Sequence, residues 1–126
     1  MEYAMMRNQN SKDIPTFYTE IAEVSITGGI LVIRILDERP DEEAINRYCR
    51  ILSAKLKGSK FPVIVDMRYL DSSDVLWLDK MLQFEGVGKR KIVILTKPSV
   101  CAGSYTPYEV FESEQDAVTR LRKADL

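Results

Sequence analysis

Two aspartates, Asp66 and Asp71, lie at the end of an almost wholly apolar run and are the first residues whose spacing suggests chemistry. A pair of carboxylates at one place can act in acid–base catalysis or hold a metal ion. The alternative is structural: an aspartate at a strand end pairs with a nearby arginine, here Arg68, or caps the next helix. We favour the structural alternative, because no residue set in the chain identifies an enzyme.

Two serines, Ser72 and Ser73, stand between Asp71 and Asp74, where a polar turn precedes an amphipathic run. Serine at a helix start accepts a hydrogen bond from a free backbone N–H, so capping is one role. Phosphorylation is the other, because a phosphate there meets free N–H groups and a favourable helix dipole. The two flanking aspartates oppose added negative charge. We keep Ser72 and Ser73 as candidate phosphorylation sites and favour capping.

The residue types that are missing exclude several kinds of chemistry. The chain contains no histidine, which excludes histidine-dependent triads and imidazole ligands. Its two cysteines, Cys49 and Cys101, are far apart and do not favour a zinc site; we expect inert free thiols. Neither GxGxxG nor a Walker A motif is present. We therefore expect no catalytic residue, no metal site and no cofactor.

Composition places the chain among ordinary globular domains. Its 126 residues suit one domain with one core, and 45% hydrophobic with 29% charged residues is a typical balance. The formal net charge of −1 gives no overall basic field for nucleic acid. No apolar run approaches the roughly 20 residues that span a bilayer. The first residues lack a signal-peptide pattern, so we expect a cytoplasmic protein.

Hydrophobic periodicity and turn signals predict the elements that must position these residues. We expect residues 1–15 to form a flexible tail and 16–126 to form a single domain. The predicted strands are 20–26, 30–36, 61–67, 91–95 and 108–111, with a hairpin turn at Gly28–Gly29 and a further turn at Gly86 and Gly88. The predicted helices begin at Pro40, at Asp74 and, with Ser113 as N-cap, after Ser113.

This order predicts an α/β fold. Two strands joined by a helix are parallel, so the strands at 61–67 and 91–95 should pair in that way. The hairpin adds antiparallel strands. We expect a mixed, largely parallel central sheet of about five strands with helices mainly on one face.

The order of elements and several segments resemble the STAS superfamily of sulfate-transporter and anti-sigma-factor-antagonist domains. The segments that carry the resemblance are VIVD (63–66), DSS (71–73), KIVIL (91–95) and VFESEQDA (110–117). Asp66-Met67-Arg68 is similar to the DxR common in the SpoIIAA-like (STAS/SEC14-type) branch. The resemblance implies a regulatory domain that works through protein contacts; the SEC14 side implies a lipid or small-molecule carrier.

The amphipathic run 74–85 is the predicted contact surface. Its apolar residues spread over an arc of about 180°, wider than the 100° or more that a core-facing helix needs. Trp77, Met81 and Phe84 lie on one edge of this arc, and their types are favoured at interfaces. The alternative is that other parts of the chain cover them.

Two further candidates remain. Ser104, Tyr105 and Tyr108 combine aromatic rings with hydroxyl groups, which suits a mostly apolar ligand cleft, although ordinary loop packing explains them as well. The run 89–91, Lys-Arg-Lys, is a basic cluster that reads as solvated surface. We expect a non-enzymatic STAS-like module that contacts a protein partner or itself as a homodimer. The alternative is a carrier of a small apolar ligand or lipid.

Overall fold

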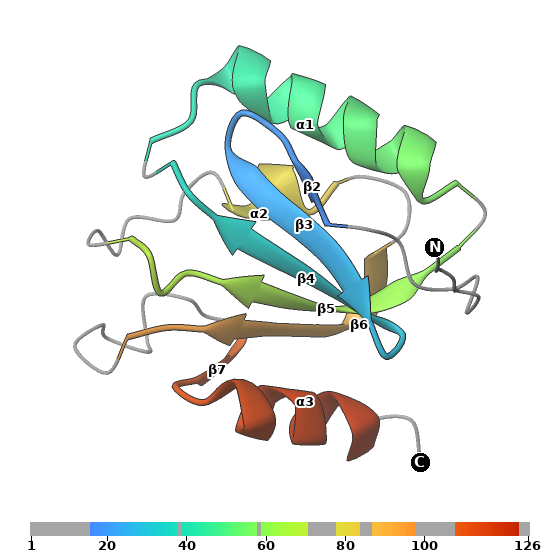
Figure 1. The fold of residues 1–126 in the computed structure, drawn as a ribbon, viewed down its shortest axis with the longest axis vertical. Coiled ribbons are helices and arrows are strands. Elements are labelled where there is room, and N and C mark those ends of the chain that lie inside the picture. Colours follow the sequence, from blue (N-terminus) through green and yellow to red (C-terminus); the bar gives the residue numbers. More distant parts are fainter. Residues whose placement is uncertain are drawn as a thin grey trace, which may run out of the picture.

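The computed structural model describes residues 16–37, 39–57, 59–70, 78–83, 87–97 and 108–123. These residues form six strands and three helices (Figure 1). The strands are β2 (Phe17–Tyr18), β3 (Ala22–Thr27), β4 (Ile30–Ile35), β5 (Phe61–Asp66), β6 (Val87–Leu95) and β7 (Glu109–Phe111). The helices are α1 (Glu42–Lys55), α2 (Leu78–Met81) and α3 (Glu114–Lys123).

All six strands belong to one mixed sheet in the order β2-β3-β4-β5-β6-β7. The pairs β2–β3 and β3–β4 are antiparallel, and the pairs β4–β5, β5–β6 and β6–β7 are parallel. The predicted α/β class with a mixed, largely parallel sheet is confirmed. The two-residue strand β2 is the addition to the predicted strands, because a strand so short leaves no periodic signal in the sequence.

The turn between β3 and β4 depends on two glycines. Gly28 has φ 60° and Gly29 has φ 81°, and Thr27 pairs with Ile30 across the turn. A tight two-residue hairpin turn needs positive φ at both central positions, which glycine adopts without steric cost. The predicted hairpin is therefore confirmed.

Helix α1 begins with a capping bond from its own sequence. The Asp41 side chain accepts a hydrogen bond from the Ala44 backbone N–H at 2.8 Å, and two glutamates occupy the first turn. Pro40 precedes this cap and is not the first helical residue. The helix turns Ala44, Ile45, Tyr48 and Leu52 into the core, whereas Ile51 is 39% exposed.

Strand β6 is longer than predicted, because it starts at Val87 and not at Lys91. Gly88, predicted to lie in a turn, is part of this strand. Its pairing with β5 is interrupted: Phe61 pairs with Val87, whereas Val63 pairs with Ile92. Pro62 lies at this interruption and has no N–H to donate to a neighbouring strand, which explains why regular pairing restarts only after it.

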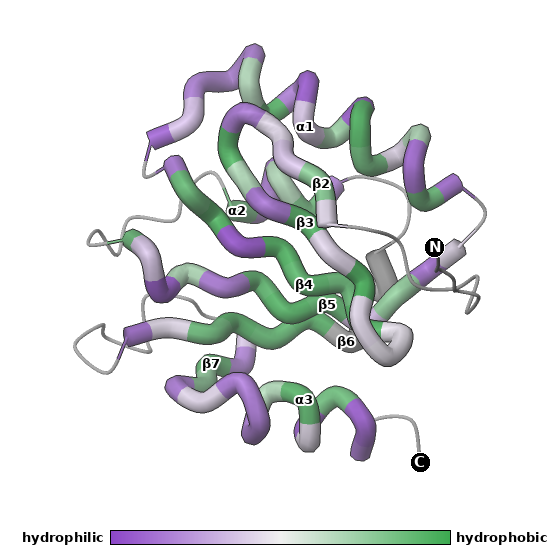
Figure 2. The backbone as a smooth tube through the Cα atoms, viewed as in Figure 1, coloured by the Kyte–Doolittle hydropathy of each residue, from purple (hydrophilic) through white to green (hydrophobic). Residues whose placement is uncertain are grey.

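Two apolar clusters lie on opposite faces of the sheet. Helices α1 and α2 cover one face over the larger cluster, in which Ile33, Leu52, Val65 and Leu78 are buried. Helix α3 covers part of the other face and buries Ala117 and Leu121 against residues such as Ile64 and Val93. The layers are visible in Figure 1, and the hydrophobic strand interiors in Figure 2. Two helices lie on one face and one on the other, which refines the predicted arrangement.

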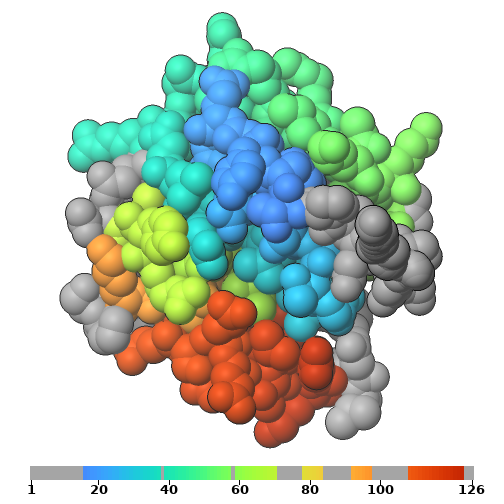
Figure 3. Space-filling model, viewed as in Figure 1, coloured from blue at the N-terminus to red at the C-terminus, as the bar shows by residue number. Residues whose placement is uncertain are grey.

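Helix α3 starts as predicted, because the Asp116 backbone N–H donates to the Ser113 side-chain oxygen at 3.3 Å. Figure 3 shows this helix in red and α1 in green, with β2 and β3 in blue between them. Within the described part of the chain, no helix is both long enough and apolar enough to cross a bilayer.

Candidate functional site at the carboxyl edge of the sheet

One row of residues crosses the whole sheet on the face that carries α3. Successive register partners along this row are Tyr18, Glu23, Arg34, Asp66, Leu95 and Phe111. Partners directly opposite each other in neighbouring strands have side chains on the same face. The end of the row on β6 and β7 is apolar. The rest of the row, from Tyr18 on β2 to Asp66 on β5, is polar and is the candidate site.

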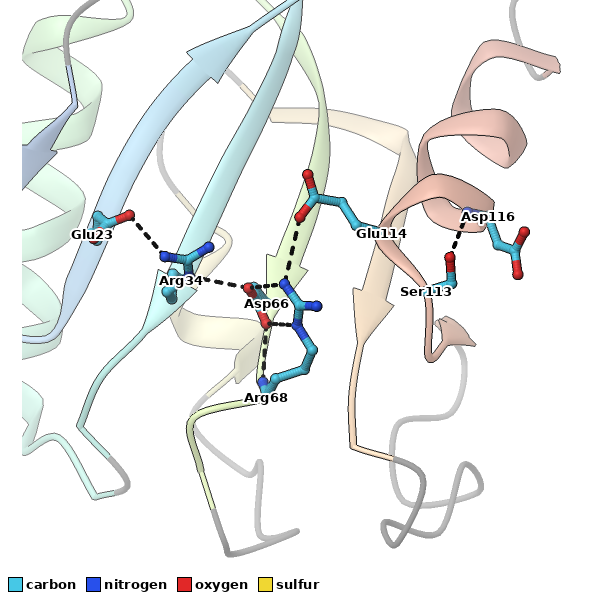
Figure 4. A network of polar contacts seen from close by, with 7 residues as sticks. All are labelled: Glu23, Arg34, Asp66, Arg68, Ser113, Glu114 and Asp116. Atoms are coloured by element: carbon cyan, nitrogen blue, oxygen red, sulfur yellow. Dashed lines mark hydrogen bonds and ion pairs between the residues drawn. The ribbon is translucent and has the colours of Figure 1, made fainter.

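Asp66 is the centre of this site (Figure 4). Its side chain is 1% exposed and accepts four hydrogen bonds. Arg68 supplies three of them, from its backbone N–H and from Nε and Nη2, each at 3.0 Å. Arg34 supplies the fourth, from Nε to Oδ2 at 3.1 Å. A carboxylate has about four acceptor positions, so this group is saturated.

The environment holds Asp66 in its ionised form. Burial raises the pKa of the Asp66 carboxyl, but the hydrogen bonds from Arg68 and Arg34 outweigh burial, and the pKa lies below its usual range. A carboxylate with a lowered pKa and no vacant acceptor position is poorly suited to accept a proton. The pairing of Asp66 with Arg68 that the sequence favoured is confirmed.

The two guanidinium groups continue the network outward. Arg34 donates from Nη1 to Glu23 at 3.2 Å and lies under the Tyr69 ring, 5.1 Å from its centroid. Arg68 reaches Glu114, in the first turn of α3, at 3.5 Å. The network therefore ties β3, β4 and β5 to the start of α3 by charge-assisted bonds.

The surface of this site combines charge with an exposed aromatic ring. Side chains of Arg34 and Arg68 keep 26% and 34% of their surface exposed, and Tyr69 is 61% exposed. Glu23 and Glu114 balance the two arginines at the rim. Arginine and tyrosine with part of their surface in water are typical of residues that contact proteins.

Sequence reasoning missed Glu23, Arg34 and Tyr69 as members of this network. A signal for Arg34 is present, since it is the single charged residue in the otherwise apolar run 30–36. Strand alternation places Glu23 and Arg34 on one face of their hairpin. The strand order that brings them beside Asp66 depends on long-range pairing, which local patterns do not encode.

Most residues of the other predicted sites lie outside the described residues. These are Asp71, Ser72, Ser73, Trp77, Phe84, Cys101, Ser104 and Tyr105. Met81, predicted to lie on a contact surface, is described and is only 1% exposed. It belongs to the core because it follows Leu78 by three residues and so lies on the same side of α2. Met81 is therefore not a surface residue.

Tyr108, a member of the predicted ligand cleft, is half-buried against the larger core cluster. Its hydroxyl donates to Asp79 Oδ1 at 2.6 Å, which joins the start of β7 to α2. Burial and the Asp79 carboxylate raise the pKa of Tyr108 to about 12. These contacts give Tyr108 a role in packing, and its hydroxyl is engaged within the chain.

The remaining groups with possible reactivity are the Cys49 thiol, the basic run 89–91 and the potential metal ligands. The Cys49 thiol of α1 donates to the backbone oxygen of Lys80 at 3.4 Å, and burial raises its pKa, which opposes thiolate formation. The basic run 89–91 lies in β6. Over the described ranges, no group of three or more histidine, cysteine, aspartate or glutamate side chains is placed to hold a metal ion.

Comparisons of this chain with protein families, with curated proteins and with solved structures find no match.

Proposed function

We propose that this chain is a non-enzymatic regulatory module of the STAS type, SpoIIAA-like branch, that acts in the cytoplasm through protein contacts and associates with itself. The resemblance quoted above supports the family, and the mixed sheet agrees with the fold that this resemblance implies. The contact surface is assigned to the apolar flank of the run 74–85, through Trp77 and Phe84.

The observation that carries this proposal is the burial of α2. Leu78 and Met81 of α2 and Leu82 directly after it are 2%, 1% and 8% exposed, so these three side chains face the core. Trp77 and Phe84 flank this buried set in the sequence, and helical spacing of the run 74–85 predicts them on one edge of its apolar arc. Tryptophan and phenylalanine are favoured at contacts between chains.

The polar site supports a contact function over a reaction. Its carboxylate is saturated by Arg34 and Arg68, so it fixes the positions of two guanidinium groups at the surface. A rigid, partly exposed pair of arginines beside Tyr69 suits recognition of a protein surface.

The test is sedimentation velocity on the wild-type chain and on the double variant Trp77→Ser, Phe84→Ser. We expect a dimer for the wild type and a monomer for the variant, because each change removes a large apolar side chain from the contact. The matched control is Ile51→Ser on α1, which removes a large apolar side chain that is 39% exposed and lies outside both the polar site and this run.

Circular dichroism melts must show that the double variant is folded. A wild-type chain that is monomeric at all concentrations would contradict the proposed self-association. A double variant that sediments like the wild type would remove Trp77 and Phe84 from the contact.

A further inference from the structure

Basic residues are concentrated at one edge of the sheet, where the parallel strands begin; we call it the amino edge. It consists of residues 27–30, 55–57, 59–61, 87–91 and 120–123. Register pairs join these segments, since Phe61 pairs with Val87, and Arg122 Nη2 lies 3.3 Å from the position that a Cβ on Gly28 would take. Figure 1 shows the ends of α1 and α3 and the β3–β4 hairpin on the same side. These segments contain nine of the 18 lysines and arginines, and the acid that lies against them is Glu109 at the start of β7, which pairs with Arg120.

Acidic residues are concentrated at the opposite edge, where the parallel strands end; we call it the carboxyl edge. Described acids lie at or just after the ends of β4, β5 and β7 and at the starts of α1 and α3: Asp37, Asp41, Glu42, Glu43, Asp66, Glu112, Glu114 and Asp116. The first turns of α1 and α3 both lie here, and both carry acids. Arg34 and Arg68 at this edge are held by acids of the same edge, as Figure 4 shows. The chain is thus nearly neutral but strongly bipolar.

Helix dipoles explain only part of this separation. Acids at a helix start and bases at a helix end are each stabilising, which accounts for the turns of α1 and α3. Lys57 directly follows the C-cap Leu56 and can stabilise the end of α1 in the same way. Lys60 lies further along the chain, and residues 89–91 lie in strand β6, so helix dipoles do not account for the basic residues at these positions.

Four cations of this edge are available for a partner. Lys57, Lys60, Arg122 and Lys123 are exposed, and within the described residues none of them forms an ion pair. By contrast, Arg120 pairs with Glu109 at 2.8 Å. A row of unpaired like charges repels itself unless an opposite charge lies near it.

We propose that the amino edge docks the carboxyl edge of a second copy of this chain, head to tail. The same three layers, α1, the sheet and α3, run from one edge to the other, so each edge presents the ends of the same elements. Stacking in this way also aligns the helix dipoles of neighbouring copies. A second copy is favoured over a uniformly anionic partner, because the chain's own carboxyl edge supplies the opposite charge. The proposal rests on the self-association proposed above and adds a second contact to it.

This contact has a distinctive geometry. It joins two different surfaces, so it does not close into a dimer and extends into longer assemblies. It is made of exposed charges, which salt screens: the Debye length is about 30 Å at 0.01 M and about 3 Å at 1 M. The contact through Trp77 and Phe84 is apolar and is not weakened in this way.

The experiment is sedimentation velocity at low and high salt on the wild type and three neutralised variants. The basic-edge variant changes Lys57, Lys60 and Lys123 to glutamine. The acidic-edge variant changes Glu42, Glu43 and Glu112 to glutamine. The control changes Arg7, Lys12 and Arg50 to glutamine, which alters net charge as much as the basic-edge variant and changes no residue assigned to either edge.

We expect the wild type and the control to form assemblies larger than a dimer at low salt and to lose them at high salt. Each edge variant should weaken this assembly about tenfold or more, as surface charges in a network do. Equal mixtures of the two edge variants should restore one contact between unlike copies, because each variant keeps the edge that the other lacks. Folding of all variants is checked by circular dichroism.

Assembly that is indifferent to salt and to both edge variants would overturn the docking of edges and leave the contact at Trp77 and Phe84 standing. A control that fails like the basic-edge variant would assign the effect to net charge and would also overturn it. Wild-type chain that stays monomeric at low salt, yet shifts on addition of a DNA duplex, would assign the amino edge to a polyanion and contradict both proposals of self-association.

Discussion

The two faces of the sheet are built differently. The face covered by α1 and α2 carries one large apolar cluster, which runs from β3 to β6. The face covered by α3 carries a small cluster over β4, β5, β6 and β7, and beside it the polar network centred on Asp66. The first face is filled by apolar side chains. On the second face, charged side chains in a hydrogen-bonded network occupy part of the area that a larger apolar cluster would cover.

This difference shows how a small domain divides its tasks. A single face can supply most of the hydrophobic stabilisation, and the other face is then available to present polar groups. The polar half is rigid because Asp66 ties two strands together, and the acid itself is buried. Stability and presentation of surface groups are thus assigned to opposite sides of the same strands.

The largest expected effect tests the two cores against each other. Leu52→Ala in α1 should lower the free energy of unfolding by about 4 kcal/mol, and Leu121→Ala in α3 by about 2 kcal/mol. Both side chains are almost fully buried, but the smaller cluster under α3 can collapse more easily around a cavity. Urea denaturation followed by circular dichroism measures both values. Equal losses would remove the asymmetry between the faces.

The next effect tests the polar network. Asp66→Asn should lower the free energy of unfolding by about 3 kcal/mol, because it leaves Arg34 and Arg68 without their buried counter-charge. The matched control is Glu114→Gln at the exposed rim, for which we expect less than about 0.5 kcal/mol. A small effect of Asp66→Asn on the free energy of unfolding would show that water solvates Arg34 and Arg68 as well as the Asp66 carboxylate does.

The same group predicts a response to pH. The folded-state pKa of Asp66 is lowered, so its contribution is present above the unfolded value near 4 and is lost as pH falls through the folded pKa. Wild-type stability should therefore fall in acid more steeply than that of Asp66→Asn. Urea titrations of both chains at several acidic pH values give the two slopes, and parallel slopes would contradict the assignment.

The smallest effect concerns the link between β7 and α2. Tyr108→Phe removes the hydrogen bond to Asp79 and should lower stability by about 1 kcal/mol. The pKa of Tyr108 is raised to about 12, so the stability it gives is present below about pH 10 and is lost as pH rises toward that value. The variant should lack this loss. Thermal melts between neutral and alkaline pH measure it, and identical alkaline profiles would rule out the link.

Local patterns in the sequence predicted most of the elements and little of the site. The glycine pair at 28–29, the Asp41 cap and the Ser113 cap each act within a few residues, so their effects could be read directly. The bond of Asp66 to Arg68 is equally local. The bond of Asp66 to Arg34 joins residues 32 positions apart and requires the strand order, which only the packing of the whole sheet determines.

The same reasoning explains the errors. Ile51 and Leu52 are neighbouring apolar residues of α1, but the sheet buries only the side of the helix that includes Leu52, and Ile51 stays 39% exposed. Met81 was predicted on the contact edge together with Trp77 and Phe84, but it is 1% exposed because it packs into the core beside Leu78. Spacing identifies which residues share a side, and only the neighbouring layer decides how much of that side is buried.

The interruption at Pro62 has a consequence for insertions and deletions in β6. Because pairing between β5 and β6 stops at Phe61 and restarts at Val63, residues 88–91 are not held in register with β5. Insertions or deletions here should leave Ile92–Leu95 and the core beneath them in place. This stretch is also the most basic part of β6, so the domain can lengthen, shorten or recharge one edge while its fold stays constant.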